Sequence, residues 1–463
     1  MTATIDNWLN SDKRKEMLVG KDYYEGKQDI LDRKRTVIDE KGGLSPVYNL
    51  PNNRIVDNQY KKLVDQKANY ALGKPMTIAT ANDAYLEALT ELFTKRVSRQ
   101  IRVLCEESVM GGIAYLYPYY NEQGEFRLRV FPAYEIIPIW VDGSHTELQE
   151  AIRIYSTSEL TDDKPIDKTV IEYYTVNGVD RYTFDGKQVV PFTNEPHINY
   201  LKTTEGEYNW NRLPIIPFKY NAKEIPLIRN VKGLQDSLNL VLSNFQNNME
   251  EDPRNTILVL KNYDGTNLGE FRRNLATYGV VKVHTVDGVQ GGVDALRIEV
   301  DAANYQALLM QLKRAIVENG RGFDAKEERM DGDPNQMNIE SMYTDIDLDV
   351  NQMESEFQAG FEELKWFIDQ YLINTGKGDF TKEKVEFVFN RDIFINEDAK
   401  IENCVKSQGI LSAQTIVSHH PWVSDLQHEL KQIEEDKQTE LEEMEAMSAF
   451  SNPKPNSNSN KSK

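Results

Sequence analysis

Residues 339–373 read IESMYTDIDLDVNQMESEFQAGFEELKWFIDQYLI and give the strongest structural signal in the chain. Apolar side chains recur at every third or fourth position, which is the spacing of one face of an α-helix. This stripe consists of Ile339, Met342, Ile346, Val350, Met353, Phe357, Phe361, Leu364, Ile368 and Tyr371. At 1.5 Å per residue a helix over this stretch spans roughly 52 Å. That length exceeds a compact domain and favours an elongated assembly.

Two shorter amphipathic helices are predicted upstream, at 227–252 and 301–319. In the first, residues Ser237 to Met249 carry no charge, although 28% of the chain is charged. The second begins at Asp301, a residue type favoured at the N-cap. It ends before Gly320, a residue type that readily adopts the left-handed C′ conformation.

The segment 253–300 between these two helices predicts a small αβ module. Its strands are expected at Thr256–Leu260, Gly279–Val283 and Leu296–Val300, its helix at Leu268–Thr277, and a flexible connection at Gly288, Gly291 and Gly292. A charged loop at 320–338 then leads from the second helix to the long one.

The region before residue 227 changes character along its length. The first 20 residues are polar and are expected to be loose. Helical spacing predicts helices over about Arg54–Leu72 and Asp83–Met110, and the apolar face of the first includes a lysine, Lys67. Alternating, aromatic-rich segments then predict a β-rich region from about 113 to 220.

The C-terminal part returns to helix after a single predicted strand at Val385–Phe389. Helices are expected at about Asn396–Gln408, Ser412–Ser418 and Asp425–Met447. Residues Ser451 to Lys463 contain only Ser, Asn, Pro and Lys, a composition that cannot bury a core and predicts disorder. Together these elements predict a large α+β protein.

Composition narrows the class of protein. The chain has 463 residues and a formal net charge of −20, which argues against a simple nucleic-acid binder with a basic surface. Two cysteines, Cys105 and Cys404, provide no disulfide framework and favour a reducing compartment. No apolar N-terminal segment predicts a signal peptide, and no apolar run is long enough to span a bilayer.

Catalytic and metal-binding motifs are not convincing. The sequence has no phosphate-binding loop, no H-E-x-x-H and no G-x-S-x-G motif. His419, His420 and His428 favour a turn or interface over a metal site, because adjacent histidines point apart and a proline follows. We therefore expect no catalytic residue, no cofactor and no metal, and hence no enzyme.

The acidic face of the long helix allows two interpretations. Asp345, Asp347 and Asp349 mimic a calcium loop, but Val350 occupies the position where that loop needs glycine. Between Glu340 and Asp369 there are nine acidic residues and one basic residue. The face is either simply solvated or a surface that repels a polyanion.

A further signal lies in the order and spacing of short stretches across the chain. They are Tyr23-Tyr24-Glu25-Gly26, Leu50-Pro51-Asn52-Asn53-Arg54-Ile55-Val56, Leu72-Gly73-Lys74-Pro75, Ala114-Tyr115, Pro214 to Pro226, Phe389-Asn390-Arg391 and Ile410-Leu411-Ser412. With them the sequence resembles the portal proteins of tailed bacteriophages, specifically the siphophage type from phages of Gram-positive hosts. The resemblance extends over about Tyr23 to Glu440.

The resemblance implies a phage portal fold, in which subunits form a ring, usually of twelve, around a central DNA channel. It divides the chain into an N-terminal region and wing (1–226), a stem helix (227–252), a clip (253–300), a second stem helix (301–319), a tunnel loop (320–338), a long wing helix and wing strand (339–395), a crown (396–448) and a disordered tail (449–463). In such a ring, uncharged residues Ser237 to Met249 would pack between neighbours.

Two sets of basic residues acquire roles from the resemblance. In the tunnel loop, Arg321, Lys326 and Arg329 are expected to make transient phosphate contacts. The alternative, that they pair with neighbouring acids of the loop, is equally open. In the clip, the residues implied in contacts with terminase or adaptor are Lys261, Arg272, Arg273 and Lys282.

The implied function is that of a channel for packaging and ejection of double-stranded DNA at the capsid vertex of the virion. Its implied partners are terminase, the major capsid and scaffolding proteins and the head–tail adaptor, with no membrane, and assembly takes place in the host cytoplasm. A strongly acidic ring would let a polyanion pass rather than hold it. The alternatives are another virion connector or tail ring component and, less favoured, a nuclease.

Overall fold

Two units make up the chain in the structure, which is a computed structural model. It describes residues 1–38, 42–47, 50–160, 165–203, 206–251, 257–261, 292–296, 302–324, 336–391, 397–418, 420–423 and 429–439. The first unit comprises Met1–Asp324 and Asp345–Asp392, and the second comprises Ala325–Thr344 and Ile393–Lys463.

The predicted long helix is confirmed as α9, Gln336–Asn374, and its part from Asp345 onward belongs to the first unit. Its apolar stripe is the core of that unit. The positions at 346, 350, 353, 357, 361, 364 and 368 are at most 1% exposed. The rings of Phe357 and Phe361 both pack edge-on against Phe218, with centroids 5.1 and 5.4 Å away. Burial of this face, rather than helix propensity, holds the helix in place.

The first residues of the chain are not loose, so that expectation was wrong. They form α1, Thr2–Asn10, and α2, Asp12–Tyr24. Ser11 caps the second helix by accepting a hydrogen bond from the backbone N–H of Arg14. Ile5 and Met17 are buried in the apolar clusters of the β-rich region. A few apolar residues on otherwise polar helices are enough, because the strands cover them.

The helical region that follows contains three helices, α3 (Gln59–Leu72), α4 (Asp83–Leu92) and α5 (Lys95–Gly111). The single helix expected over Asp83–Met110 is therefore wrong. The chain leaves the helical conformation at Phe93, whose ring packs 5.4 Å from that of Phe387. Gly112 caps the C-terminus of α5; it has φ of 79° and lies so close to the Glu224 carbonyl that a Cβ would be 2.3 Å from its oxygen.

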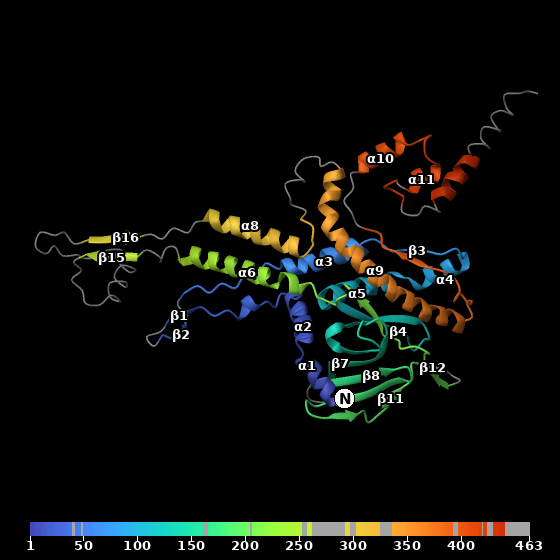
Figure 1. Cartoon of the computed structure of the whole chain (residues 1–463), viewed down its shortest axis with the longest axis horizontal. Helices are drawn as coiled ribbons and strands as arrows, with labels where there is room; N and C mark the ends of the chain where they lie inside the picture. The colour runs from blue at the N-terminus through green and yellow to red at the C-terminus, as the bar shows by residue number, and fades with distance from the viewer. Residues whose placement is uncertain are drawn as a thin grey trace, which may run out of the picture. The chain divides into compact units, whose positions relative to one another are not determined.

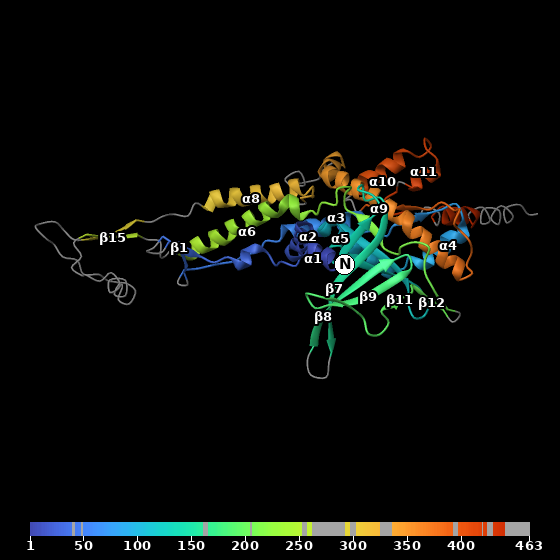
Figure 2. The ribbon, with the colours of Figure 1, turned by 60° about the horizontal axis from the view of Figure 1, so that its bottom comes forward.

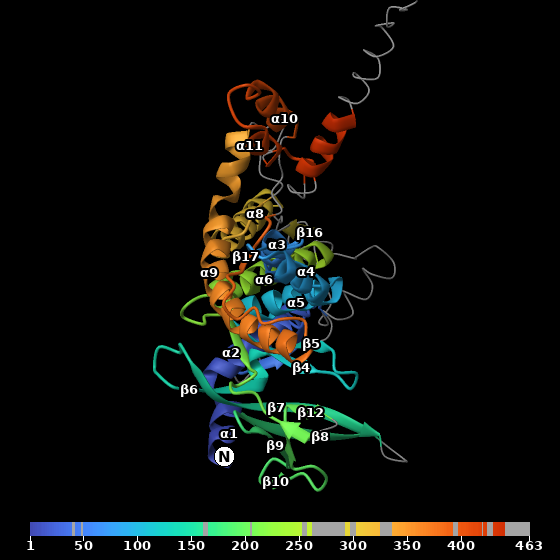
Figure 3. The same ribbon diagram turned by 90° about the vertical axis from the view of Figure 1, so that its right-hand side faces the viewer.

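The β-rich region is confirmed and consists of antiparallel sheets (Figure 3). A three-stranded sheet has the order β14-β4-β5, and a larger one the order β10-β9-β8-β7-β6 with β11 also paired to β9. The strands are β4 (Ile113–Tyr120), β5 (Phe126–Pro132), β6 (Ile136–Trp140), β7 (Leu148–Leu160), β8 (Pro165–Thr175), β9 (Gly178–Phe184), β10 (Val189–Pro191), β11 (His197–Ile198) and β14 (Ile216–Lys219). A short pair, β12 (Leu201–Thr203) and β13 (Gly206–Tyr208), completes the region.

Two packed helices correspond to the shorter helices predicted from the sequence. They are α6, Ile228–Glu251, and α8, Ala302–Asn319, and they run side by side in Figures 1 and 2. Between them, β15 (Ile257–Lys261) pairs antiparallel with β16 (Gly292–Leu296).

β16 begins at Gly292, a residue that the sequence assigned to a flexible connection, and of the strand predicted at Leu296–Val300 only Leu296 lies within the described residues. Glycine has little preference for strands, and so its strand position is hidden in the sequence. The predicted helix at Leu268–Thr277 and strand at Gly279–Val283 lie outside the described residues.

Smaller elements complete the fold. In the first unit, β17 (Glu386–Val388) pairs with β3 (Thr77–Ala79), and β1 (Thr36–Ile38) pairs with β2 (Leu44–Pro46). Short 3-10 helices lie at Asp29–Asp32 and Ala133–Glu135. The second unit contains α10 (Glu397–Lys406), α11 (Ala413–Ser418) and a helical stretch at 429–439. The predicted disordered tail lies outside the described residues.

Candidate functional site

The candidate site comprises α6, α8 and the first residues of the loop that follows α8. Along α6, four polar residues stand one helical turn apart, and we call them the polar ladder: Gln235, Asn239, Ser243 and Asn247. All four are at most 2% exposed. Polar groups so deeply buried need hydrogen-bonding partners.

The partners are backbone N–H groups of the extended segment before α3 and of the first two residues of α3. The N–H groups of residues 53, 55 and 57 donate to Asn247, Ser243 and Asn239 at 2.7, 3.0 and 3.0 Å. Those of residues 59 and 60 both donate to Gln235 Oε1, at 3.0 and 3.1 Å. Every second residue of an extended chain advances about 6.6 Å, and every fourth residue of a helix about 6 Å. These two distances are similar, so successive N–H groups of the extended segment meet successive side chains of the polar ladder.

This arrangement changes the interpretation of the uncharged stretch Ser237 to Met249. Asn239, Ser243 and Asn247 bind the same chain and are buried within it. Leu240 and Met249 remain exposed on other faces of α6. Packing between neighbouring chains therefore stays a prediction, and it would fall to the exposed positions.

α8 packs on α6, and Tyr305 near its start makes two of the contacts. The Tyr305 ring lies 4.9 Å from that of Phe245, and its hydroxyl accepts a hydrogen bond from Asn248 Nδ2 at 2.9 Å. Farther along, Lys313 forms an ion pair with Asp57 at 2.7 Å, which ties α8 to the extended segment. The other side of α8 exposes large apolar residues, with Met310 67% exposed.

The end of α8 differs from the expectation for Gly320. The left-handed backbone falls on Arg321, with φ of 47°, and Gly320 has a helical hydrogen bond to the Ile316 carbonyl. Gly320 is required for another reason, since a Cβ there would lie 2.4 Å from Leu63 Cδ1 of α3. The glycine thus permits close packing, and the arginine carries the strained turn.

The buried ion pair between Lys67 and Asp349 holds the turn at Arg321 in place. Lys67 of α3 is completely buried, and its Nζ donates to Asp349 Oδ2 at 2.6 Å and to the Arg321 carbonyl at 3.0 Å. Asp349 also accepts from the Tyr220 hydroxyl at 2.6 Å. Burial lowers the pKa of Lys67 and Asp349 opposes that shift, whereas burial raises the pKa of Tyr220. The cluster joins α3 and α9 to the base of the loop.

The structure describes only part of the predicted basic sites. The Arg321 guanidinium lies 3.8 Å from Asp349 Oδ1, and its side chain is 56% exposed. The sequence suggested either contacts with phosphate or pairing with acidic residues of the loop, and Asp349 belongs to α9 instead. Lys261 is the last residue of β15, opposite Gly292. Lys326, Arg329, Arg272, Arg273 and Lys282 lie outside the described residues.

The acidic face of α9 is not uniformly solvated. Asp345 is exposed, but Asp349 and Asp369 are buried. Asp369 is paired with Lys365 at 2.6 Å and accepts from the Tyr85 hydroxyl at 2.6 Å. Within the described ranges, no three His, Cys, Asp or Glu residues converge as metal ligands do.

Remaining expectations concern histidines, cysteines and membranes. His420 packs beside Trp422, and His419 and His428 lie outside the described residues. Cys105 and Cys404 are buried as free thiols. No helix in the described part of the chain is both long enough and apolar enough to cross a bilayer.

Buried polar contacts thus fix α6, α8 and the first residues after α8 within the first unit. Comparison with known proteins identifies the family. Residues 9–443 match the family model described as "Phage portal protein, SPP1 Gp6-like". The chain is 30% identical to the portal protein of Bacillus phage SPP1 over 94% of this chain and 86% of that protein. It is also 30% identical to the portal protein of Clostridium phage phiCD119 over 92% and 93% of the two chains.

The chain therefore belongs to the phage portal protein family. This decides between a portal and the other virion components that the sequence allowed, and it makes the chain a structural, non-enzymatic component of the virion that forms a ring-shaped oligomer. Among solved structures, the neck of a native GTA particle computed with C12 symmetry has a TM-score of 0.38 and 13% identity, covering 78% of this chain and 89% of that one.

Proposed function

We propose that the protein forms a ring, of twelve subunits, around a channel through which double-stranded DNA is packaged into the phage head and later ejected. The observation that carries this proposal is the family match across residues 9–443. The formal charge of −20 per subunit supports it, because an acidic channel wall repels phosphates and keeps DNA mobile.

In this proposal α6 and α8 are the stem, at 227–252 and 301–319, and residues 253–300 are the clip. The wing comprises 1–226 and 339–395, and 396–448 form the crown. Exposed apolar residues of the stem helices, among them Leu240 and Met310, support contact with neighbouring subunits. Ring closure uses different patches on the two sides of each subunit, so this contact is head-to-tail.

The partners proposed are DNA, terminase, the head–tail adaptor, and the major capsid and scaffolding proteins, at the capsid vertex of a virion assembled in the host cytoplasm. The tunnel loop is 320–338, with Arg321, Lys326 and Arg329 as transient phosphate contacts. The exposed guanidinium of Arg321 supports its part. In the clip, terminase or adaptor contacts are assigned to Lys261, Arg272, Arg273 and Lys282.

Negative-stain electron microscopy of the purified protein tests the ring. Rings with a central hole and about twelve-fold symmetry are expected, and a compact monomer at all concentrations would overturn the proposal. The tunnel loop is tested by replacing Arg321, Lys326 and Arg329 together with alanine. Rings should still form and DNA packaging should fall, whereas unchanged packaging would refute the phosphate contacts.

A further inference from the structure

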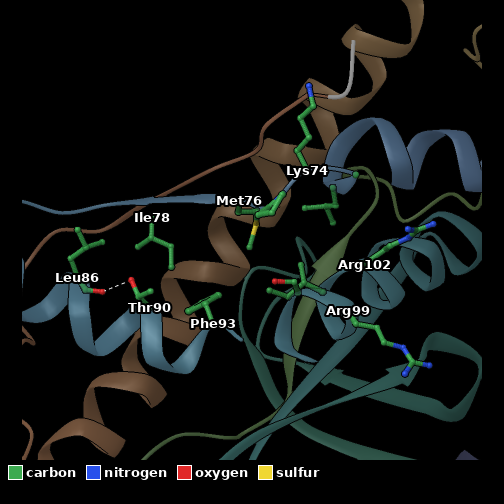
Figure 4. A pocket seen from close by; sticks show the side chains of 13 residues that line it. Lys74, Met76, Ile78, Leu86, Thr90, Phe93, Arg99 and Arg102 are labelled. Atoms are coloured by element: carbon green, nitrogen blue, oxygen red, sulfur yellow. Dashed lines mark hydrogen bonds between the residues drawn. The ribbon is translucent and has the colours of Figure 1, made fainter. Parts of the chain in front are cut away.

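A cavity of about 410 Å³ lies where the end of α3, the strand β3 and the helices α4 and α5 meet (Figure 4). We call it the α3–α5 pocket. Its floor is apolar and consists of Leu72, Met76, Ile78, Leu86, Phe93 and Ile101. Only Ile101 is fully buried, and the others are half-buried, so apolar surface faces the cavity. A hollow of this size and character is typical of ligand pockets.

Basic side chains line the rim of the same pocket. They are Lys74, at the end of α3, and Arg99 and Arg102, on α5. Figure 4 shows the two arginines on the side opposite Ile78 and Leu86, extending outward from the apolar part. Arg102 lies 3.2 Å from Glu106. The side chain of Arg99 is exposed and makes no hydrogen bond or ion pair with any residue that the structure describes.

The start of α5 is unusual for this chain and for a helix. From Lys95 to Arg102 it carries four basic residues and no acidic one, in a protein with 20 more acidic than basic residues. Its first turn has no acidic residue and its N-cap, Thr94, makes no side-chain capping bond. Cations at a helix N-terminus oppose the helix dipole and weaken the helix. Lys95 and Arg96, in the first turn, therefore do not serve the stability of α5, whereas Arg102 supports it through its ion pair with Glu106.

We propose that the α3–α5 pocket binds an acidic peptide segment of a partner protein, which inserts large apolar side chains into the floor and sets carboxylates against the rim. Apolar anchors surrounded by charged contacts are the usual design of such interfaces. A nucleic acid would use the cations but would leave the aliphatic floor unfilled. The chemistry of the pocket thus favours a peptide over DNA.

The test uses fluorescence anisotropy with the labelled peptide EELEELFEELEE and the full-length protein. Saturable binding is expected, and a control peptide with every Leu and Phe replaced by Gln should bind at least about tenfold more weakly because it lacks the anchors. Arg99→Glu should weaken binding about fivefold to thirtyfold, since it turns an attraction into a repulsion. Met76→Gln, which changes only the floor, should weaken it about tenfold.

Lys62→Glu is the matched control, because it makes the same change of charge on an exposed face of α3 that does not line the pocket. It should leave binding unchanged. Arg99→Gln removes the charge without reversing it. Circular dichroism and electron microscopy of rings show whether each variant still folds and assembles, so that a loss of binding is distinguished from a loss of folding. Because rings are scored separately, failure of the pocket proposal is distinguishable from failure of the proposed portal ring.

Three results would overturn the proposal. The first is no saturable binding of the peptide. The second is equal binding of the Gln-containing peptide, which would mean attraction by charge alone. The third is that a labelled DNA duplex binds more tightly than the peptide, with sensitivity to Arg99→Glu but not to Met76→Gln, which would make the surface a nucleic-acid contact.

Discussion

Replacing Lys67 with methionine tests the buried cluster beneath Arg321. The wild-type Nζ is completely buried and has two partners, Asp349 Oδ2 at 2.6 Å and the Arg321 carbonyl at 3.0 Å. Methionine fills similar space but offers no charge and no hydrogen bond. Asp349, whose side chain is 11% exposed, then keeps only the Tyr220 hydroxyl and the more distant Arg321 guanidinium.

The expected loss follows from these contacts. Breaking a buried ion pair by removing one partner costs about 3–5 kcal/mol, because the remaining charge is left uncompensated. The Tyr220 hydrogen bond and the Arg321 guanidinium still stabilise the carboxylate, which favours the lower end of that range. The Arg321 carbonyl loses its donor, which adds about 1 kcal/mol. We therefore expect Lys67→Met to lower the free energy of unfolding by about 3–4 kcal/mol.

The assay is urea unfolding followed by tryptophan fluorescence, at one fixed protein concentration because oligomers gain stability with concentration. The double variant Lys67→Met with Asp349→Leu should recover at least about 2 kcal/mol relative to the sum of the two single losses. A loss below about 1 kcal/mol for Lys67→Met, or single losses that simply add, would refute the reasoning that the pair is buried and coupled.

Further predictions concern the polar ladder, the half-buried carboxyl group of Glu107 and the end of α8. Asn239→Leu leaves the N–H of Asp57 without a partner and should cost about 1–3 kcal/mol in urea unfolding, whereas Ser237→Ala on the exposed face of α6 should cost under about 0.5 kcal/mol. Burial raises the pKa of Glu107 from 4.5 to about 7, so its share of stability is present below pH 4.5 and is lost as the pH rises to about 7. Glu107→Gln should therefore raise the melting temperature relative to wild type at pH 8 but not at pH 4.5, and equal effects at both would contradict the pKa. Gly320→Ala should destabilise by about 1–3 kcal/mol in thermal unfolding, because the new methyl group meets a leucine of α3, and an unchanged melting temperature would count against that contact.

Sequence patterns predicted the helices and strands whose apolar residues recur at regular spacing. α9 and strands such as β4 were predicted because their apolar positions repeat in register with helix or strand. α1 and α2 were missed because few of their residues are apolar, and what orders them is a sheet formed far along the chain. The break at Phe93 was missed because the apolar spacing continues through it, although the ring turns toward Phe387.

The candidate site was less predictable, because its contacts join residues far apart in sequence. One signal was available: Lys67 stood on the apolar face of a predicted helix, and a lysine there needs a buried partner. Nothing local identified that partner as Asp349, 282 positions away. The ladder on α6 was visible only as an absence of charge, and its meaning depended on an extended segment that the sequence assigned to a helix from Arg54.

The polar ladder also determines which substitutions the extended segment tolerates. The α6 side chains contact the main chain of residues 53, 55 and 57, and so at Ile55 the side chain itself is not recognised by Ser243. Most replacements at that position should be accepted, with proline the exception because it has no N–H to donate. On α6, each position of the polar ladder needs a side-chain oxygen placed to accept a backbone N–H, and it should therefore tolerate far fewer replacements. Ile55 and Ser243, although in contact, thus have very different freedom to vary, and a mutational scan should show more accepted substitutions at Ile55 than at Ser243.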